Sequence, residues 1–261
     1  MAQMEIKITM KKNKLMNYKN INLKSSLIGL IWVFSLGSSV LAQTPSELLW
    51  YDEPAAVWEE ALPVGNGRLG AMVFGKTAEE RIQLNEETYW SGGPYSTVVK
   101  GGAEILPEIQ KLIFDGKPLE AHKLFGRHLM GYPVEQQKYQ SLANLHLFFD
   151  GHEKVNNYRR DLDLTSGITS TSYEVNGVSY KREVFASEPD QCIVIRLSTS
   201  GTLNFRAQLR GVRNMAHSNY GTDYFRMDGV GDNGLVLTGR SSDYLGVKSQ
   251  MRYEAQLKAV P

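Results

Sequence analysis

The chain has 261 residues, of which 42% are hydrophobic, 10% aromatic and 22% charged, and its net charge is +1. This composition is that of an ordinary globular protein and excludes collagen-like, disordered and fully membrane-embedded classes. Of the 29 basic and 28 acidic residues, six lysines and one glutamate lie in residues 1–42, which leaves residues 43–261 with 23 basic and 27 acidic side chains. A body with this acidic excess has no general attraction for polyphosphate, so nucleic acid is not an expected partner.

The first predicted element is a secretory signal peptide over residues 1–42. Its lysines precede an apolar run from Ser26 to Leu36, and small residues follow up to Ala42, which are the three parts of such a leader. An apolar core of about ten residues is shorter than the roughly 20 that span a bilayer as a helix. The alternatives are an N-terminal membrane anchor or a buried helix. We expect cleavage after Ala42 and a secreted or periplasmic product that has no membrane contact afterwards.

The remaining residues 43–261 are predicted to form one mainly β domain, a large antiparallel β-sandwich with a short helical hairpin as an insert. The hairpin is predicted over residues 103–130, where Ile105 and Ile109 share a helical face and the first helix ends near Gly116. Pro118 suits the first turn of the second helix, because its missing N–H would be unpaired there anyway. We expect this hairpin to lie against a sheet.

The sandwich prediction rests on period-two alternation after the hairpin. Alternation marks strands with one buried and one exposed face. Asn176-Gly177 predicts a two-residue hairpin turn, since a type I′ turn needs positive φ at both positions. In the segment after this turn, one side of the predicted strand carries Val178, Tyr180, Arg182 and Val184. Strands are predicted at residues 158–164, 168–175, 178–187, 191–199 and 202–211, and this spacing is typical of a sandwich or barrel.

Cysteine and histidine usage predicts neither a disulfide nor a metal site. Cys192 is the single cysteine, so no internal disulfide can form, and its apolar surroundings favour a small core residue over a nucleophile. The histidines show no metal-ligand spacing and are predicted to be surface or capping residues. No cofactor is expected. The five histidines are His122, His128, His146, His152 and His217.

Two segments carry more polar and aromatic residues than a plain sandwich needs. The first, around Gly65-Asn-Gly67, allows a tight loop from which Asn66 and Arg68 could project. In the second, a strand runs into a loop that carries amides, carboxylates and aromatic rings. Pyranose rings stack on aromatic faces, and sugar hydroxyls need planar hydrogen-bonding partners. The candidate sugar-binding or domain-interface residues are Asn66, Arg68, Asn85, Glu86, Tyr89 and Trp90.

The same loop also allows a purely structural interpretation. Trp90 could be buried, and the carboxylates could cap backbone groups or form ion pairs. Glu86 and Glu87 are adjacent, so on a strand they point to opposite faces. They therefore make a poor pair for glycoside hydrolysis, which needs two carboxyl groups facing across a sugar.

These two segments carry a resemblance to a known family. Leu62-Pro-Val-Gly-Asn-Gly-Arg-Leu-Gly-Ala-Met-Val-Phe-Gly75 and Leu84-Asn-Glu-Glu-Thr-Tyr-Trp-Ser-Gly-Gly-Pro94 resemble the N-terminal domain of glycoside hydrolase family 95, the α-L-fucosidases. The resemblance extends over residues 47–258. It implies a large antiparallel β-sandwich here, followed in the family by a helical barrel.

The resemblance also implies an activity and two partners. The family hydrolyses terminal α-L-fucosyl linkages with inversion, and its catalytic glutamate, asparagines and aspartate belong to the barrel. None of them maps onto this chain, so we expect no catalytic residue in it and no hydrolysis by the chain alone. The implied partners are a fucosylated glycan and the catalytic helical barrel domain. Because further strands follow in the family, the sandwich is also expected to be incomplete at its C-terminus.

Two other functions are left open. One is a free-standing carbohydrate-binding or domain-docking module that uses Arg68, Asn85, Tyr89 and Trp90. The other is a surface or interaction sandwich with no sugar role.

Overall fold

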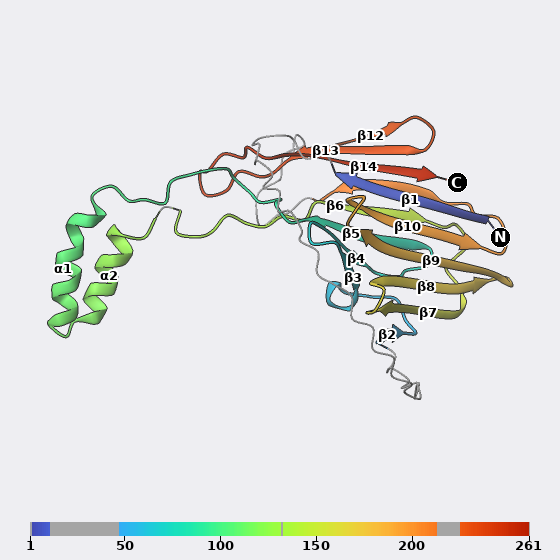
Figure 1. The fold of residues 1–261 in the computed structure, drawn as a ribbon, viewed down its shortest axis with the longest axis horizontal. Coiled ribbons are helices and arrows are strands. Elements are labelled where there is room, and N and C mark those ends of the chain that lie inside the picture. The colour runs from blue at the N-terminus through green and yellow to red at the C-terminus, as the bar shows by residue number, and fades with distance from the viewer. Residues whose placement is uncertain (1, 11–46, 132, 213–224, 261) are drawn as a thin grey trace, which may run out of the picture.

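The computed structural model describes residues 2–10, 47–131, 133–212 and 225–260. Within these residues the strands form two antiparallel sheets, which confirms the mainly β prediction (Figure 1). One sheet has nine strands in the order β12-β13-β14-β1-β10-β9-β8-β7-β2, and the other has five in the order β11-β6-β5-β4-β3. The strands are β1 Ala2–Met10, β2 Leu48–Tyr51, β3 Leu62–Gly65, β4 Leu69–Val73, β5 Glu79–Glu86, β6 Ala143–Phe148, β7 Asn156–Asp163, β8 Ile168–Val175, β9 Val178–Ser187, β10 Cys192–Thr199, β11 Arg206–Gly211, β12 Phe225–Val230, β13 Gly234–Arg240 and β14 Arg252–Val260.

The main core lies between the two sheets. Leu145 and Leu147 of β6 are 0% exposed and belong to one apolar cluster with Ile193 and Ile195 of β10 in the other sheet. This is the packing of a β-sandwich, in which the inward-facing residues of both sheets interdigitate. The turn Asn176-Gly177 has φ angles of 50° and 79°, which confirms the positive φ predicted at both positions.

Strand β1 places the first residues of the chain in the middle of the larger sheet. It pairs antiparallel with both β10 and β14, and Ile6 and Ile8 are buried in the main core. The sequence assigned these residues to the leader and did not predict this strand. The apolar run 26–36 and the cleavage site after Ala42 lie outside the described residues, so cleavage there stays a prediction. No helix in the described part of the chain is long and apolar enough to cross a membrane.

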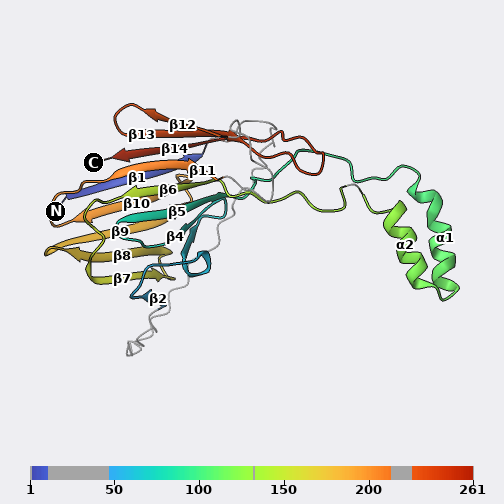
Figure 2. The same cartoon turned by 180° about the vertical axis from the view of Figure 1, so that it is seen from behind.

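The helical hairpin forms in the predicted part of the sequence, but it does not pack against a sheet. Its helices are α1 Gly102–Phe114 and α2 Pro118–His128, with Pro118 in the first turn of α2. The expectation that the hairpin lies against a sheet is wrong, because both views show it at the end of an extended arm, away from the sandwich (Figures 1 and 2). The helices bury Ile109 and Ala121 and pack on each other. An amphipathic pattern indicates that a face is covered, but not by which element.

One histidine also differs from the prediction. His152 is buried, and its Nδ1 lies 3.0 Å from the Tyr173 hydroxyl, within an aromatic cluster that includes Phe149 and Tyr180. Burial lowers the pKa of His152, since the charged imidazolium is disfavoured away from water. His217 lies outside the described residues. Among those described, no group of three or more metal-ligating side chains comes together. Cys192 is free and buried, as predicted.

Gly75 joins β4 to the loop that precedes β5, and its site leaves no room for a side chain. Its φ is +75°, and an added Cβ would lie 2.7 Å from the Tyr158 hydroxyl oxygen and 2.9 Å from Arg160 Cδ. We expect Gly75→Ala to lower the free energy of unfolding by about 3 kcal/mol, from left-handed strain plus overpacking. Gly116 has a similar φ of +73° but nothing within 4 Å, so Gly116→Ala should cost only about 1–2 kcal/mol. Urea denaturation measures both, and equal losses would contradict the crowding argument.

Candidate functional site

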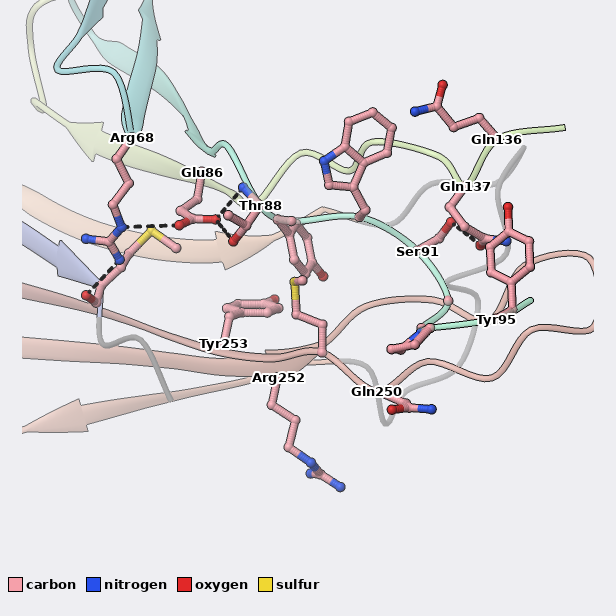
Figure 3. Close-up of a pocket in the computed structure, with 17 residues that line it drawn as sticks. Arg68, Glu86, Thr88, Ser91, Tyr95, Gln136, Gln137, Gln250, Arg252 and Tyr253 are labelled. Carbon is pink, nitrogen blue, oxygen red and sulfur yellow. Dashed lines mark hydrogen bonds and ion pairs between the residues drawn. The ribbon is translucent and has the colours of Figure 1, made fainter. Parts of the chain in front are cut away.

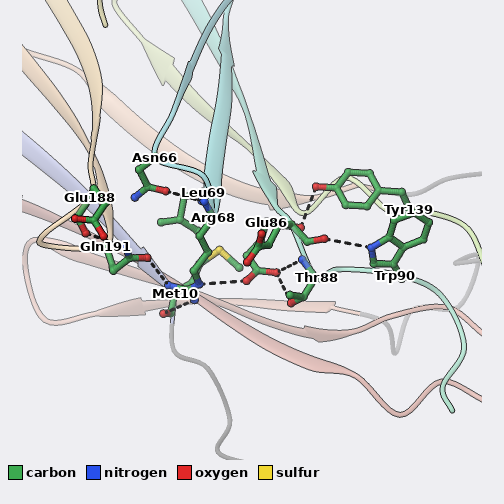
Figure 4. Close-up of polar contacts among 11 residues, drawn as sticks. Met10, Asn66, Arg68, Leu69, Glu86, Thr88, Trp90, Tyr139, Glu188 and Gln191 are labelled. Carbon is green, nitrogen blue, oxygen red and sulfur yellow. Dashed lines mark hydrogen bonds and ion pairs between the residues drawn. The ribbon is translucent and has the colours of Figure 1, made fainter. Parts of the chain in front are cut away.

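The candidate site begins at the turn between β3 and β4. The Asn66 side-chain oxygen accepts hydrogen bonds from the backbone N–H groups of Arg68 and Leu69, at 3.1 and 2.8 Å. The Asn66 amide nitrogen donates to the Ser187 carbonyl oxygen at the end of β9, at 2.8 Å. Both polar atoms of the Asn66 side chain are therefore hydrogen-bonded to protein groups (Figure 4). These bonds fix the backbone that carries Arg68.

Arg68 and Glu86 form the polar centre of the site (Figure 4). Arg68 Nε lies 3.2 Å from Glu86 Oε1, and the two side chains are 19% and 6% exposed. Arg68 also donates to the carbonyl oxygen of Met10 at 3.3 Å and to the side-chain oxygen of Gln191 at 3.4 Å. The other oxygen of Glu86 accepts from the backbone N–H and the hydroxyl of Thr88 at 2.8 and 2.6 Å. This carboxylate is held by protein donors, as the structural interpretation of the loop predicted.

Trp90 follows on the loop after β5 and is only partly buried. Its Nε1 donates to the Glu87 carbonyl oxygen at 3.2 Å, and its ring meets the Tyr139 ring edge-on with centroids 5.1 Å apart. The Tyr139 hydroxyl donates to the Glu86 carbonyl oxygen at 2.9 Å. The Trp90 ring is therefore fixed in orientation, and part of it stays open to solvent, which differs from the buried alternative.

Tyr89 is the buried aromatic residue of the loop. It is 4% exposed, its hydroxyl donates to the Arg240 carbonyl oxygen at 3.2 Å, and its ring meets that of Tyr253 edge-on at 4.9 Å. Burial raises the pKa of Tyr89 above its usual range and raises the pKa of Tyr253 to about 12. Both phenols stay neutral at ordinary pH, so they act as apolar faces and hydrogen-bond donors.

These groups border a pocket of about 620 Å³ (Figure 3). It lies where the chain leaves the sandwich toward the helices (Figure 1). The volume lies within the range of about 300–1,000 Å³ that is usual for small-molecule sites. Among the described residues that line it, Glu86 is the only carboxylate. The lining residues are Met10, Arg68, Glu86, Thr88, Tyr89, Trp90, Ser91, Gly92, Gly93, Pro94, Tyr95, Gln136, Gln137, Gln250, Met251, Arg252 and Tyr253.

Gln137 places a side-chain amide in the pocket wall. Its side-chain oxygen accepts from the Ser91 hydroxyl at 3.1 Å, while Ser91 Oγ itself accepts from the backbone N–H of Lys138 at 2.8 Å. The Gln137 Nε2 atom is buried and has no hydrogen-bond partner among the described residues. A buried amide donor without an acceptor is costly, and an oxygen atom of a ligand would satisfy it.

Two glycines in the loop after β5 leave room for the side chains of Gln137 and Gln250. Gly92 has φ +66°, and an added Cβ would lie 2.4 Å from the Gln137 side-chain oxygen. At Gly93 the added Cβ would lie 2.8 Å from Gln250 Cγ. The Ser-Gly-Gly-Pro segment therefore permits the contact between this loop and the two glutamines.

The structure brings four of the six predicted residues to one pocket and leaves two beside it. Arg68, Glu86, Tyr89 and Trp90 line the pocket, whereas Asn66 and Asn85 do not. Sequence reasoning missed Gln137, Gln250 and Tyr253. These residues come from segments distant in the chain, and no local pattern distinguishes them from other polar or aromatic strand and loop residues.

The two-sheet sandwich carries an aromatic- and amide-lined pocket beside a glycine-rich loop, which is a candidate binding site, and the fold alone does not assign its function. The family described as "Glycosyl hydrolase family 65, N-terminal domain" matches residues 49–261. The chain belongs to this family of N-terminal glycoside hydrolase domains. This confirms the predicted resemblance to the N-terminal domain of a glycoside hydrolase.

Curated relatives are α-fucosidases. The chain is 37% identical over 163 residues to "Alpha-L-fucosidase 2" of Arabidopsis thaliana, which covers 60% of this chain and 19% of the relative. It is 34% identical over 213 residues to "Probable alpha-fucosidase A" of Aspergillus oryzae, which covers 76% of this chain and 28% of the relative. The chain therefore spans between about a fifth and just over a quarter of the length of these relatives.

Proposed function

We propose that the chain is the N-terminal domain of a fucosidase-like glycoside hydrolase and that its pocket contacts a fucosylated glycan. The observation that carries this proposal is Gln137 Nε2, which has no partner in the described part of the chain and lies in the wall of a pocket that also presents the Trp90 ring. An aromatic face suits the C–H face of a sugar ring, and an amide donor suits a hydroxyl oxygen. The α-fucosidase relatives support fucose as the terminal sugar.

The proposal assigns hydrolysis to other parts of the enzyme. Inverting hydrolysis needs a carboxylic acid and a base-activated water on opposite sides of the sugar ring. Among the described residues that line the pocket, Glu86 is the single carboxylate, and it is bound by Arg68 and Thr88. We therefore propose that the catalytic groups come from a separate helical barrel domain and that this chain alone does not hydrolyse the glycan.

A second candidate function, domain docking, is favoured by the helical arm. Phe114 at the end of α1 is 87% exposed and Leu119 at the start of α2 is 78% exposed. Both residues flank the turn between α1 and α2, and these helices stand on an arm away from the sandwich (Figure 2). Such exposed apolar side chains suit contact with another domain of the same enzyme.

Calorimetric titration with a fucosyl-α-1,2-galactoside tests the proposal. We expect saturable binding, a roughly five- to thirtyfold loss of affinity in Trp90→Ala and Gln137→Ala, and recovery of the glycan unhydrolysed. Each contact is worth about 1–2 kcal/mol, and 1.4 kcal/mol is a factor of ten. Gln208→Ala is the matched control, because Gln208 is an exposed glutamine on β11 that does not line the pocket.

No binding at millimolar glycan would remove the sugar-contact proposal and leave domain docking. Hydrolysis by the chain alone would contradict the assignment of catalysis to another domain.

A further inference from the structure

The N-terminal residues complete the larger sheet. Strand β1 has eight paired positions with β10, from Ala2–Thr199 to Thr9–Cys192, and six with β14, from Glu5–Val260 to Met10–Ala255. Neighbouring strands in a sheet lie about 4.8 Å apart. Without β1 a gap one strand wide would therefore separate β12, β13 and β14 from the rest of this sheet (Figure 1).

The side chains of β1 contact three parts of the molecule. On the inner face Ile6 and Ile8 are 0% and 2% exposed and join the main core. On the outer face Glu5 forms an ion pair with Arg196 at 3.3 Å. At the end of the strand the Met10 carbonyl oxygen accepts the hydrogen bond from Arg68 in the candidate site. A strand added by accident at a sheet edge would pair backbone groups without burying its side chains in the core.

We propose that residues 2–10 are a permanent strand of the folded domain, and that the position between β10 and β14 is a strand-acceptor site for this segment of the same chain. The functional chain then keeps these residues after folding and does not lose them with a cleaved leader. Removal would expose two rows of unpaired backbone N–H and C=O groups and open two core positions. The proposal does not depend on the sugar-binding proposal.

A single substitution tests the register, because the chain has one cysteine and Thr9 is its direct partner across β1 and β10. Directly opposite residues in an antiparallel pair have Cα atoms about 4.5–5.5 Å apart, which is within the range that a disulfide spans. We expect the full-length Thr9→Cys chain, treated with diamide, to form an intramolecular disulfide with Cys192, seen as one cross-linked peptide after digestion. The partly exposed position of Thr9 makes this a mild change.

Ala2→Cys is the matched control. Residue 2 lies on the same strand but pairs with Thr199, seven positions along β10 from Cys192, so it should stay reduced. The intact mass of the full-length chain, purified from a host with an active signal peptidase, should include residues 2–10. Three results would each overturn the proposal: a Thr9→Cys chain that stays reduced, a disulfide between two copies, or an intact mass that matches a chain starting at Gln43.

Discussion

Replacing Arg182 with leucine is expected to lower the free energy of unfolding by about 3–5 kcal/mol at about pH 8, because it leaves the Glu80 charge buried without its partner. Arg182 and Glu80 are 3% and 0% exposed at the side chain and form an ion pair between the sheets. Glu80 also accepts from the backbone N–H of Gly75 at 2.9 Å, and Arg182 donates to the Lys76 carbonyl oxygen at 3.2 Å. Denaturant unfolding of the full chain measures the loss.

The pH dependence of this variant has a definite sign. Burial raises the pKa of Glu80 above 4.5, and the Arg182 charge opposes the rise. Without Arg182 the pKa in the folded variant rises further, while the unfolded value stays the same. A group whose pKa is higher in the folded than in the unfolded state makes a contribution to stability that is fully present below the unfolded pKa. This contribution is lost as pH rises through the folded pKa. The deficit of Arg182→Leu should therefore be smaller at about pH 4.5 than at about pH 8.

Two controls isolate the buried pair. Arg206→Leu removes a partner of Asp150 from a pair whose side chains are 71% and 85% exposed, and it should cost under about 1 kcal/mol. The double variant Glu80→Leu with Arg182→Leu should be more stable than Arg182→Leu alone, since no unpaired charge remains. Equal losses for Arg182→Leu and Arg206→Leu, or a deficit that grows at acid pH, would contradict the argument.

Replacing Ile6 with alanine is expected to cost about 2–5 kcal/mol, the usual range for truncating a fully buried isoleucine. Ile6 is 0% exposed, pairs across the sheet with Ile195 and Ala259, and belongs to the main core. Its exposed neighbour Lys7 is the matched control, and Lys7→Ala should change the stability by less than about 0.5 kcal/mol. The midpoint of urea unfolding of the full chain compares the two, and an Ile6→Ala chain as stable as the Lys7→Ala chain would show that β1 lies outside the cooperative fold.

Strands β7 to β10 could be predicted from local sequence alone. In β8 and β9, side chains alternate between the core and the exposed face, and Asn176-Gly177 supplies the turn between them. Both signals depend on residues within a few positions of each other, so a single sequence carries them. The start of β11 at Arg206 shows the limit, because the predicted strand began four residues earlier.

The candidate site could be predicted only in part. Arg68, Glu86 and Trp90 lie in two short motifs whose composition already indicated polar and aromatic recognition. Gln137 and Tyr253 join them only because the Trp90 bridge to Tyr139 and the ring contact of Tyr89 with Tyr253 bring distant segments together. Which distant residues meet is decided by sheet order, and sheet order leaves no local trace in the sequence.

The sequence by itself determined the class of the fold, because alternation and turn chemistry are local and the hydrophobic effect then requires two sheets to cover each other. It also predicted a helical hairpin over residues 103–130, and the two helices lie at Gly102–Phe114 and Pro118–His128. Only the tertiary structure decided that the helices stand on an arm and that residues 2–10 occupy the centre of a sheet. The physical reason is the same in both cases: an apolar face must be buried, but its partner is chosen by the packing of the whole chain. The burial of Ile6 from β1 in one apolar cluster with Leu145 from β6 is one such choice.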